Sequence, residues 1–165
     1  MIVFEKQDVS RSIRLPSVVK KEVSRLSPLT EYERNWLRAC FQQAESKETT
    51  LYYAKALDTQ NLIGIFSLSI SKPDNRTSWM VIEYLYVLPD FRGQYYEQSQ
   101  FKASELIVAE IILLARKISS VVNLELIALQ LAHDRLQSSY ENMGFVVIQR
   151  STKKHNEVWM AMPVM

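Results

Sequence analysis

The chain has 165 residues, a formal net charge of +2 and a hydrophobic fraction of 47%. This length suffices for one domain with a buried core, so we expect a single domain over residues 1–165. So small a charge does not point to nucleic acid or an anionic membrane, because affinity for either comes from concentrated basic patches. No stretch has the pattern of a signal peptide or the length to span a bilayer, so we expect no membrane contact.

The numbers of cysteine and histidine residues limit the disulfides and metal sites that the chain can form. The chain has one cysteine and two histidines. One cysteine excludes an internal disulfide and fits a cytoplasmic protein, and so few ligands make a metal site unexpected. Cys40 lies in a helical pattern with no histidine nearby in sequence, so we interpret it as a buried thiol rather than a nucleophile.

The first half of the chain predicts one strand, two helices and a hairpin. A helix is expected at 16–26, where apolar residues recur at helical spacing. A second helix is expected after Thr30, whose hydroxyl and Glu33 form the pattern of a capping box. The strands are expected at 1–6, 51–57 and 62–70, and the short polar link 58–61 joins the last two as a hairpin.

The second half begins with an aromatic and β-branched strand at 79–87, which Pro89 ends. A polar loop at 90–100 leads into a long helix that starts near Ala103 and runs to about Ile118. Gly144 fits the left-handed end of a short helix. The remaining elements are expected as a strand at 123–131, that short helix at 133–143, and strands at 145–150 and 158–164.

This order, with Val87 and Pro89 before the loop and Tyr140 four residues before Gly144 and Phe145, resembles the GNAT N-acetyltransferase superfamily. The resemblance implies an α/β (α+β) fold, with a mixed, mostly antiparallel central sheet of six to seven strands flanked by about four helices. It implies an acetyltransferase that transfers the acetyl group of acetyl-CoA to a primary amine by direct attack in a ternary complex.

In that family, backbone amides in the loop before the long helix hold the pyrophosphate of acetyl-CoA, within a glycine-rich motif. One placement of the motif starts at Arg92 and Gly93, but it puts Glu97 at a position where glycine is usual. The preferred placement starts six residues later at Gln98, includes Phe101 and Lys102, and ends at Ala103. Phe101 is its one irregular residue.

The resemblance also implies roles for other residues near the cofactor. A strand bulge around Leu85 to Leu88, including Val87, would present a backbone N–H to the thioester carbonyl. His133 stands where the family has an asparagine that binds the pantetheine arm. A cap for the following helix is an equally good interpretation of His133.

Two residues are candidates for acid–base chemistry. Tyr140 matches the family's general acid, and a phenol with an ordinary pKa of about 10 is protonated at neutral pH and can donate as the thiolate leaves. Glu83 is the one carboxylate of its strand, and we expect it to be buried there and to take a proton from the acceptor ammonium. A cleft residue that holds an arginine or lysine is the other interpretation of Glu83.

A second class of function remains open. Because both placements of the phosphate motif are imperfect, the chain could keep the fold without catalysis and serve as a ligand-sensing or partner-binding protein. A homodimer is left open as a partner, and the identity of the amine is not indicated.

Overall fold

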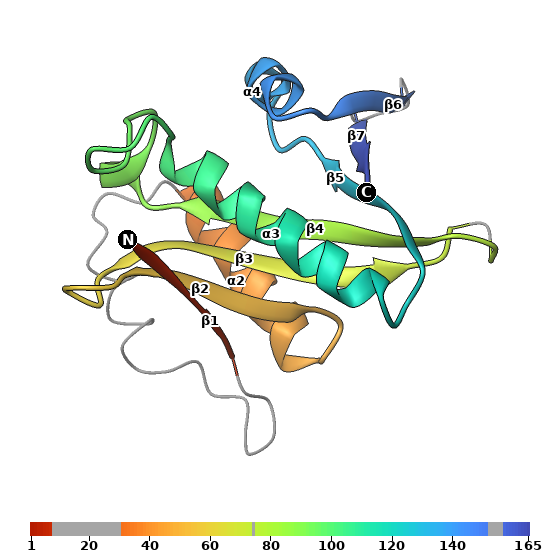
Figure 1. The fold of residues 1–165 in the computed structure, drawn as a ribbon, viewed down its shortest axis with the longest axis horizontal. Helices are drawn as coiled ribbons and strands as arrows, with labels where there is room; N and C mark the ends of the chain where they lie inside the picture. Colours follow the sequence, from red (N-terminus) through yellow and green to blue (C-terminus); the bar gives the residue numbers. More distant parts are fainter. Residues whose placement is uncertain (8–30, 74, 152–156) are drawn as a thin grey trace. The chain divides into compact units, whose positions relative to one another are not determined.

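The computed structural model describes residues 1–7, 31–73, 75–151 and 157–165. Within these residues seven strands hydrogen-bond in the order β1-β2-β3-β4-β5-β7-β6 (Figure 1). The strands are β1 (Ile2–Lys6), β2 (Thr50–Ala56), β3 (Leu62–Ser71), β4 (Ser78–Val87), β5 (Leu124–Gln130), β6 (Val146–Ser151) and β7 (Glu157–Pro163). The helices are α2 (Glu31–Glu45), α3 (Ala103–Ser119) and α4 (Gln137–Asn142), with 3-10 turns η1 (Pro89–Phe91) and η2 (Asp134–Leu136).

The fold class predicted from the sequence is confirmed. β4 and β5 pair in parallel, whereas β1–β2, β2–β3, β5–β7 and β6–β7 are antiparallel. Three α-helices lie in the described part of the chain. The helix expected at 16–26 and the cap at Thr30 lie outside the described residues.

The chain forms two compact units, each of which is described by itself. The first unit comprises residues 1–68 and 84–107, and the second comprises residues 69–83 and 108–165. The single domain expected over residues 1–165 stays a prediction.

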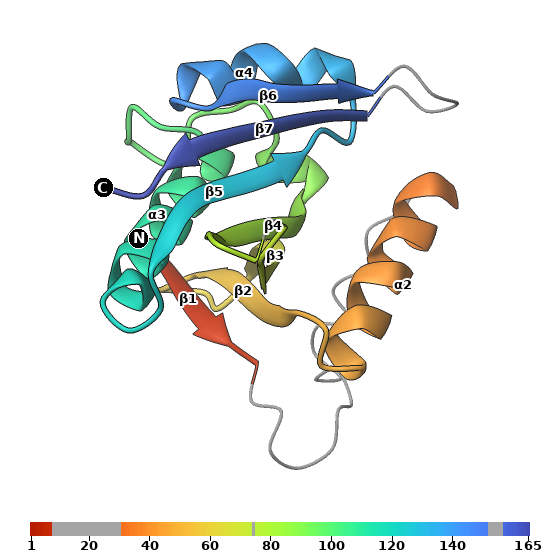
Figure 2. The same ribbon diagram turned by 90° about the vertical axis from the view of Figure 1, so that its right-hand side faces the viewer.

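One hydrophobic cluster of the first unit joins residues of α2 (Figure 2) to residues of β2, β3 and β4. Leu37, Cys40 and Ala44 recur at helical spacing and are buried in one cluster with Tyr53 and Tyr86. The predicted interpretation of Cys40 as a buried thiol is confirmed, because its exposed fraction is 0%. Burial raises the pKa of this thiol to about 12, although a contact with Ser67 lowers it. Cys40 is therefore protonated and unreactive at neutral pH.

The second unit is built on β5. Its residues Leu124 to Leu129 pair in parallel with Ser78 to Ile82 of β4, and its other edge pairs with β7. Ile127 and Ala128 are fully buried, which matches the apolar run of the sequence. β7 pairs with β5 along one edge and with β6 along the other, so β7 is a central strand.

A close approach at Gly64 holds the start of α3 against β3. A Cβ at this position would lie 2.8 Å from the Ile107 side chain and 2.8 Å from the Tyr86 carbonyl oxygen. Both distances are shorter than van der Waals contact, and the second involves backbone that cannot rotate away. Glycine is therefore required in β3 despite its low strand propensity.

We predict that Gly64→Ala destabilises the protein by about 1 to 3 kcal/mol, because the added methyl group overpacks this contact. In a chain of this size the melting temperature should fall by roughly 2 to 4 °C per kcal/mol. Thermal unfolding followed by circular dichroism measures the change. Ser71→Ala, another small substitution in β3, is the control, and an equal Tm for both variants would contradict the prediction.

Candidate active site

The end of β4 extends beyond its pairing with β5. The β4–β5 ladder ends at Ile82 and Leu129, whereas β4 runs on to Val87. Leu85 and Val87 are half-buried, and the next backbone N–H, that of Leu88, donates to Ile63 in β3 at 2.9 Å. These positions keep a strand conformation up to the loop, and the bulge and the thioester contacts expected there stay predictions.

The Arg92 side chain is fully engaged within the first unit. Its Nε donates to the Val87 carbonyl at 2.7 Å, and its Nη2 lies 2.7 Å from Glu33 Oε1 of α2. The Arg92 Cζ also lies 4.9 Å from the centre of the Tyr86 ring, a cation–π distance. The guanidinium therefore joins α2 to the end of β4, and a phosphate contact from it stays a prediction.

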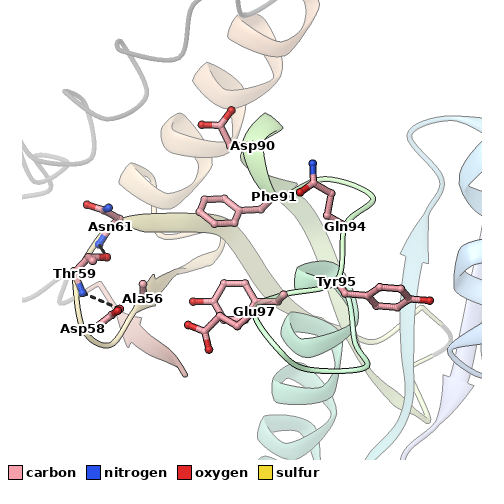
Figure 3. Close-up of a pocket in the computed structure, with 10 residues that line it drawn as sticks. Ala56, Asp58, Thr59, Asn61, Asp90, Phe91, Gln94, Tyr95 and Glu97 are labelled. Carbon is pink, nitrogen blue, oxygen red and sulfur yellow. Dashed lines mark hydrogen bonds between the residues drawn. The ribbon is translucent and has the colours of Figure 1, made fainter.

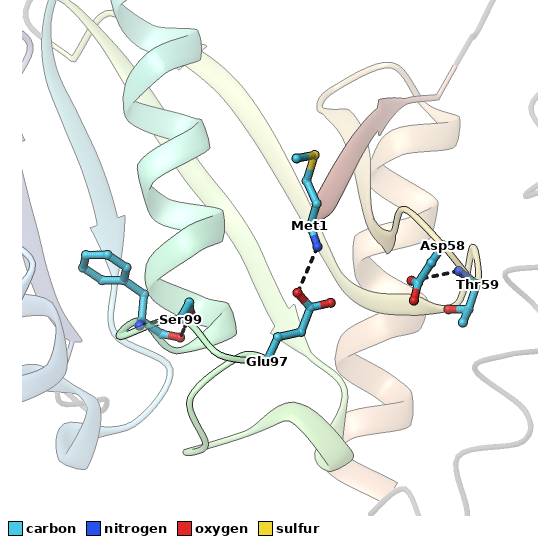
Figure 4. Close-up of polar contacts among 6 residues, drawn as sticks. Met1, Asp58, Thr59, Glu97 and Ser99 are labelled. Atoms are coloured by element: carbon cyan, nitrogen blue, oxygen red, sulfur yellow. Dashed lines mark hydrogen bonds and ion pairs between the residues drawn. The ribbon is translucent and has the colours of Figure 1, made fainter.

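The geometry of the stretch after Arg92 does not favour a phosphate. Gly93 has a φ of +69°, with no atom within 4 Å of an added Cβ, so the glycine serves a turn and not a close approach. Tyr95 is 67% exposed, and its ring points away from the β2–β3 turn (Figure 3). The Glu97 carboxylate lies 3.0 Å from the Met1 amino group (Figure 4). A fixed negative charge at Glu97 disfavours phosphate in the first placement of the motif.

Hydrogen bonds close the loop around Gln98. The Tyr96 N–H donates to the Phe101 carbonyl at 2.8 Å, and the Ser99 hydroxyl donates to the same carbonyl at 2.9 Å. The Phe101 N–H donates to Ser99 Oγ at 3.2 Å. Gln98 and the Phe101 side chain are exposed. The Phe101 amide, which the second placement of the motif includes, therefore already has a partner.

Glu105 caps the start of α3. The Lys102 N–H donates to Glu105 Oε2 at 2.7 Å, which is half of a capping box. Sequence reasoning missed Glu105, and the acidic residue three positions after the cap is the signal that could have found it. Because this amide is also engaged, Lys102 does not offer its backbone to an anion in this conformation.

The amides of Ser104 and Glu105 differ. Within the described residues, no hydrogen-bond partner is found for their backbone N–H groups, whereas Ala103 follows the bridge between Tyr95 and Lys102 and is buried. The two free amides lie in the first turn of α3, where the helix dipole favours negative charge. Ala103 is 1% exposed, so its small side chain fits a packed helix start. The start of α3 therefore presents unpaired N–H groups at the positive end of a helix dipole, and phosphate binding there stays a prediction.

Tyr140 lies in α4 of the second unit. Its backbone carbonyl accepts hydrogen bonds from the N–H groups of Met143 and Phe145, both at 3.0 Å, and Gly144 between them has a φ of +101°. The Tyr140 ring packs edge-on against buried Phe145, with centres 5.6 Å apart. Burial raises the pKa of Tyr140 to about 12. Its hydroxyl has no hydrogen bond within the described residues and stays protonated at neutral pH.

The expected burial of Glu83 is wrong. Its side chain is exposed, and its Oε1 accepts a hydrogen bond of 2.6 Å from the Ser69 hydroxyl. A carboxylate at this position avoids desolvation by lying where water reaches it. The alternative interpretation of Glu83 is not supported among the described residues, since no arginine or lysine pairs with it. Its role as a base stays a prediction.

His133 acts as a cap. Its Nδ1 accepts a hydrogen bond from the Arg135 N–H at 3.3 Å at the start of η2. This confirms one of the two interpretations of the residue. If the imidazole is neutral, Nε2 carries the proton and can still donate, so a contact with the pantetheine arm stays a prediction.

The candidate residues divide between the units. Glu83, His133 and Tyr140 belong to the second unit, whereas the residues from Leu85 to Ala103 belong to the first. No helix in the described parts of the chain is long and apolar enough to cross a membrane. The same residues contain no group of three histidine, cysteine, aspartate or glutamate side chains arranged to hold a metal ion.

No protein-family model and no curated protein matches the chain. Solved structures do match. One is AtaTR bound with acetyl-CoA, at a TM-score of 0.70 and 14% identity over 99% of this chain and 93% of that one. Another is a protein from Desulfovibrio desulfuricans assigned to the GNAT acetyltransferase family, at a TM-score of 0.68 and 12% identity over 100% of both chains. The chain has the GNAT fold.

A third match to this GNAT fold is AtaT complexed with acetyl-methionyl-tRNA. It has a TM-score of 0.67 and 14% identity over 99% of this chain and 95% of that one. At these identities the likeness establishes the arrangement of elements and not the individual site residues. The GNAT fold and the free amides of α3 are thus two separate observations.

Proposed function

We propose that this protein is an acetyl-CoA-dependent N-acetyltransferase acting on a primary amine. The observation that carries the proposal is the pair of free amides at Ser104 and Glu105, in the helix that follows β4 of a GNAT fold. A pyrophosphate there would meet two N–H donors and the positive end of a helix dipole. Acetyl-CoA carries this group, and AtaTR of the same fold binds acetyl-CoA.

In the proposed reaction the amine nitrogen attacks the carbonyl carbon of the thioester. The carbonyl oxygen becomes an oxyanion, which backbone N–H groups near Leu85 and Val87 would stabilise. The C–S bond then breaks, CoA leaves as a thiolate, and the attacking nitrogen loses its second proton to solvent to give the neutral amide. Glu83, directly or through a water, would accept the proton that the acceptor ammonium loses before attack.

Tyr140 would assist the leaving thiolate. Its pKa of about 12 means that it holds its proton more tightly than a thiol of pKa about 8.5. The hydroxyl therefore acts as a hydrogen-bond donor that stabilises the developing thiolate, without complete transfer of its proton. Because the hydroxyl has no competing partner within the described residues, it can turn to the sulfur without breaking another bond.

The acceptor is proposed only as a primary amine. A small metabolite, an antibiotic, a peptide N-terminus and the amino acid of a charged tRNA all present this group. AtaT complexed with acetyl-methionyl-tRNA supports including the last class. The alternative function, a ligand-sensing or partner-binding protein, is favoured by the internal engagement of Arg92, Phe101 and Lys102.

Calorimetric titration with acetyl-CoA separates the two functions. Binding at micromolar concentration supports the transferase, whereas no heat at millimolar ligand supports the alternative. Desulfo-CoA, which lacks the thioester, should retain most of the affinity if phosphate contacts dominate. A panel of amines, including aminoacyl-tRNA, then tests transfer by mass spectrometry of the products.

Ser104→Glu tests the anion site. It places a carboxylate beside the free amides, where one unit charge at 4 Å repels another by about 1 kcal/mol in bulk water and more when partly buried. We expect acetyl-CoA affinity to fall at least fivefold in calorimetry. The fold should be kept, because an acidic residue stabilises a helix start by about 0.3 to 1 kcal/mol.

Two controls accompany Ser104→Glu. Ser104→Ala should keep the affinity, and Tyr95→Ala tests the first placement of the motif, which lies outside the proposed site. A large loss in Tyr95→Ala with none in Ser104→Glu would return the phosphate to residues 92–97. Ala103→Glu is less informative, because a carboxylate at this buried position would also disturb packing.

Tyr140→Phe removes only the hydroxyl. We expect kcat to fall by about 10²- to 10⁴-fold, the usual value of a general acid, with unchanged acetyl-CoA affinity. Thermal stability should not decrease, since the hydroxyl makes no hydrogen bond within the described residues. With its pKa near 12, Tyr140 should produce no decline in rate between pH 7 and pH 10. An unchanged kcat would leave Tyr140 a packing residue.

Glu83→Gln keeps the size of the side chain but cannot accept a proton. We expect kcat/KM at neutral pH to fall by roughly 10²-fold or more, with partial recovery at alkaline pH, where free amine is abundant. Ser69→Ala, which removes the hydroxyl that donates to Glu83, is the control and should have a much smaller effect. Wild-type rates for Glu83→Gln at every pH would remove Glu83 from the mechanism.

A further inference from the structure

The first unit contains a cavity of about 340 Å³ outside the proposed anion site. One wall is the β2–β3 turn, with Asp58, Thr59 and Asn61, and the other is the loop after β4. Phe91 and Glu97 point from that loop toward the turn (Figure 3). A volume of this size lies in the range of small-molecule sites.

The charged side chains that line this cavity are all acidic, and the Met1 ammonium pairs with one of them. Asp58, Asp90 and Glu97 line the cavity, and none of its lining residues is a lysine, arginine or histidine. Tyr96 is buried in the same wall, and its pKa responds to these carboxylates. Its pKa is raised first by burial and then by the charge of Glu97, a hydrogen bond with Glu97 and the charge of Asp58. The cavity therefore repels phosphates and attracts cations.

Aromatic rings supply the apolar part of the wall. The Phe91 and Tyr96 rings lie with their centres 6.2 Å apart, and both line the cavity. Carboxylates together with ring faces favour an organic ammonium over a hydrated metal ion, because the methyl or methylene groups of the ammonium can lie against the rings. Divalent metal ions would instead require several converging oxygen ligands.

An ammonium group already lies against one of these carboxylates. The Met1 amino nitrogen is 3.0 Å from Glu97 Oε2, at the edge of the cavity (Figure 4). This ion pair is exposed on both sides, so it is weak and exchangeable. The Glu97 carboxylate thus accepts a positively charged nitrogen in its present geometry, and a ligand ammonium would compete with Met1 for it.

We propose that this cavity binds a compact organic ammonium cation, at a site separate from that for acetyl-CoA. The carboxylates of Asp58 and Glu97 hold the positive nitrogen, and Phe91 and Tyr96 cover its carbon atoms. The proposal does not depend on acetyl transfer. The acidic cavity favours cations, whereas the amides at the start of α3 favour an anion, and the two sites use different parts of the loop.

Choline is the probe, with its uncharged isostere 3,3-dimethyl-1-butanol as the matched ligand. Titration of the full chain, followed by chemical-shift changes, should show millimolar binding of choline and at least fivefold weaker binding of the alcohol, the loss expected for one unit charge at 4 Å in water. Saturating acetyl-CoA should leave choline binding in place. A quaternary ammonium cannot be N-acetylated, so binding is observed without transfer.

Glu97→Gln and Asp58→Asn should each weaken choline binding by about fivefold, whereas Glu45→Gln, an exposed carboxylate at the end of α2, should not. All three residues are exposed, and a melting curve for each variant confirms the fold. Equal binding of choline and the alcohol, equal affinity in all variants, or loss of choline binding with acetyl-CoA would each overturn the proposal. If Ser104→Glu loses acetyl-CoA binding but keeps choline binding, the proposal of a cation site is supported.

Discussion

The contact between β3 and α3 at Gly64 is the constraint on which the first unit depends. Ile107 lies one turn after the start of α3, and its side chain reaches the β3 backbone where any Cβ would stand. The same position receives the Tyr86 carbonyl oxygen from β4. The absence of a side chain at Gly64 thus lets α3 pack directly against β3. This contact fixes the distance between the first amides of α3 and the sheet. A backbone site for an anion needs such a fixed frame, because it has no flexible side chain with which to adjust.

The loop between β4 and α3 separates two electrostatic environments. Its first part, from Asp90 to Glu97, is acidic and contributes to the cavity, whereas its last residue leads into amides that favour an anion. Arg92, the one arginine in this loop, is neutralised by Glu33 and faces the Tyr86 ring.

Sequence periodicity predicted the elements well and side-chain partners poorly. Each strand expected in the described residues is found within a few positions, because apolar alternation and turn residues act locally. The exposure of Glu83 depends on where water reaches its strand, which no local pattern encodes. The role of Arg92 depends on Glu33, 59 positions earlier in the chain. The helix start near Ala103 was predicted because it has a local signal, but the hydrogen bonds from Ser99 and Glu105, which leave the free amides near Ser104, could not be predicted.

The burial of Cys40 has a practical consequence. It is the chain's only cysteine, its exposed fraction is 0%, and its pKa of about 12 leaves almost no thiolate in neutral solution. Thiol-reactive dyes should therefore detect the CoA that is released in an assay, with little background signal from Cys40 of the folded protein. By the same reasoning, a cysteine introduced at an exposed position would be the single labelling site for a fluorophore, without prior removal of the native thiol.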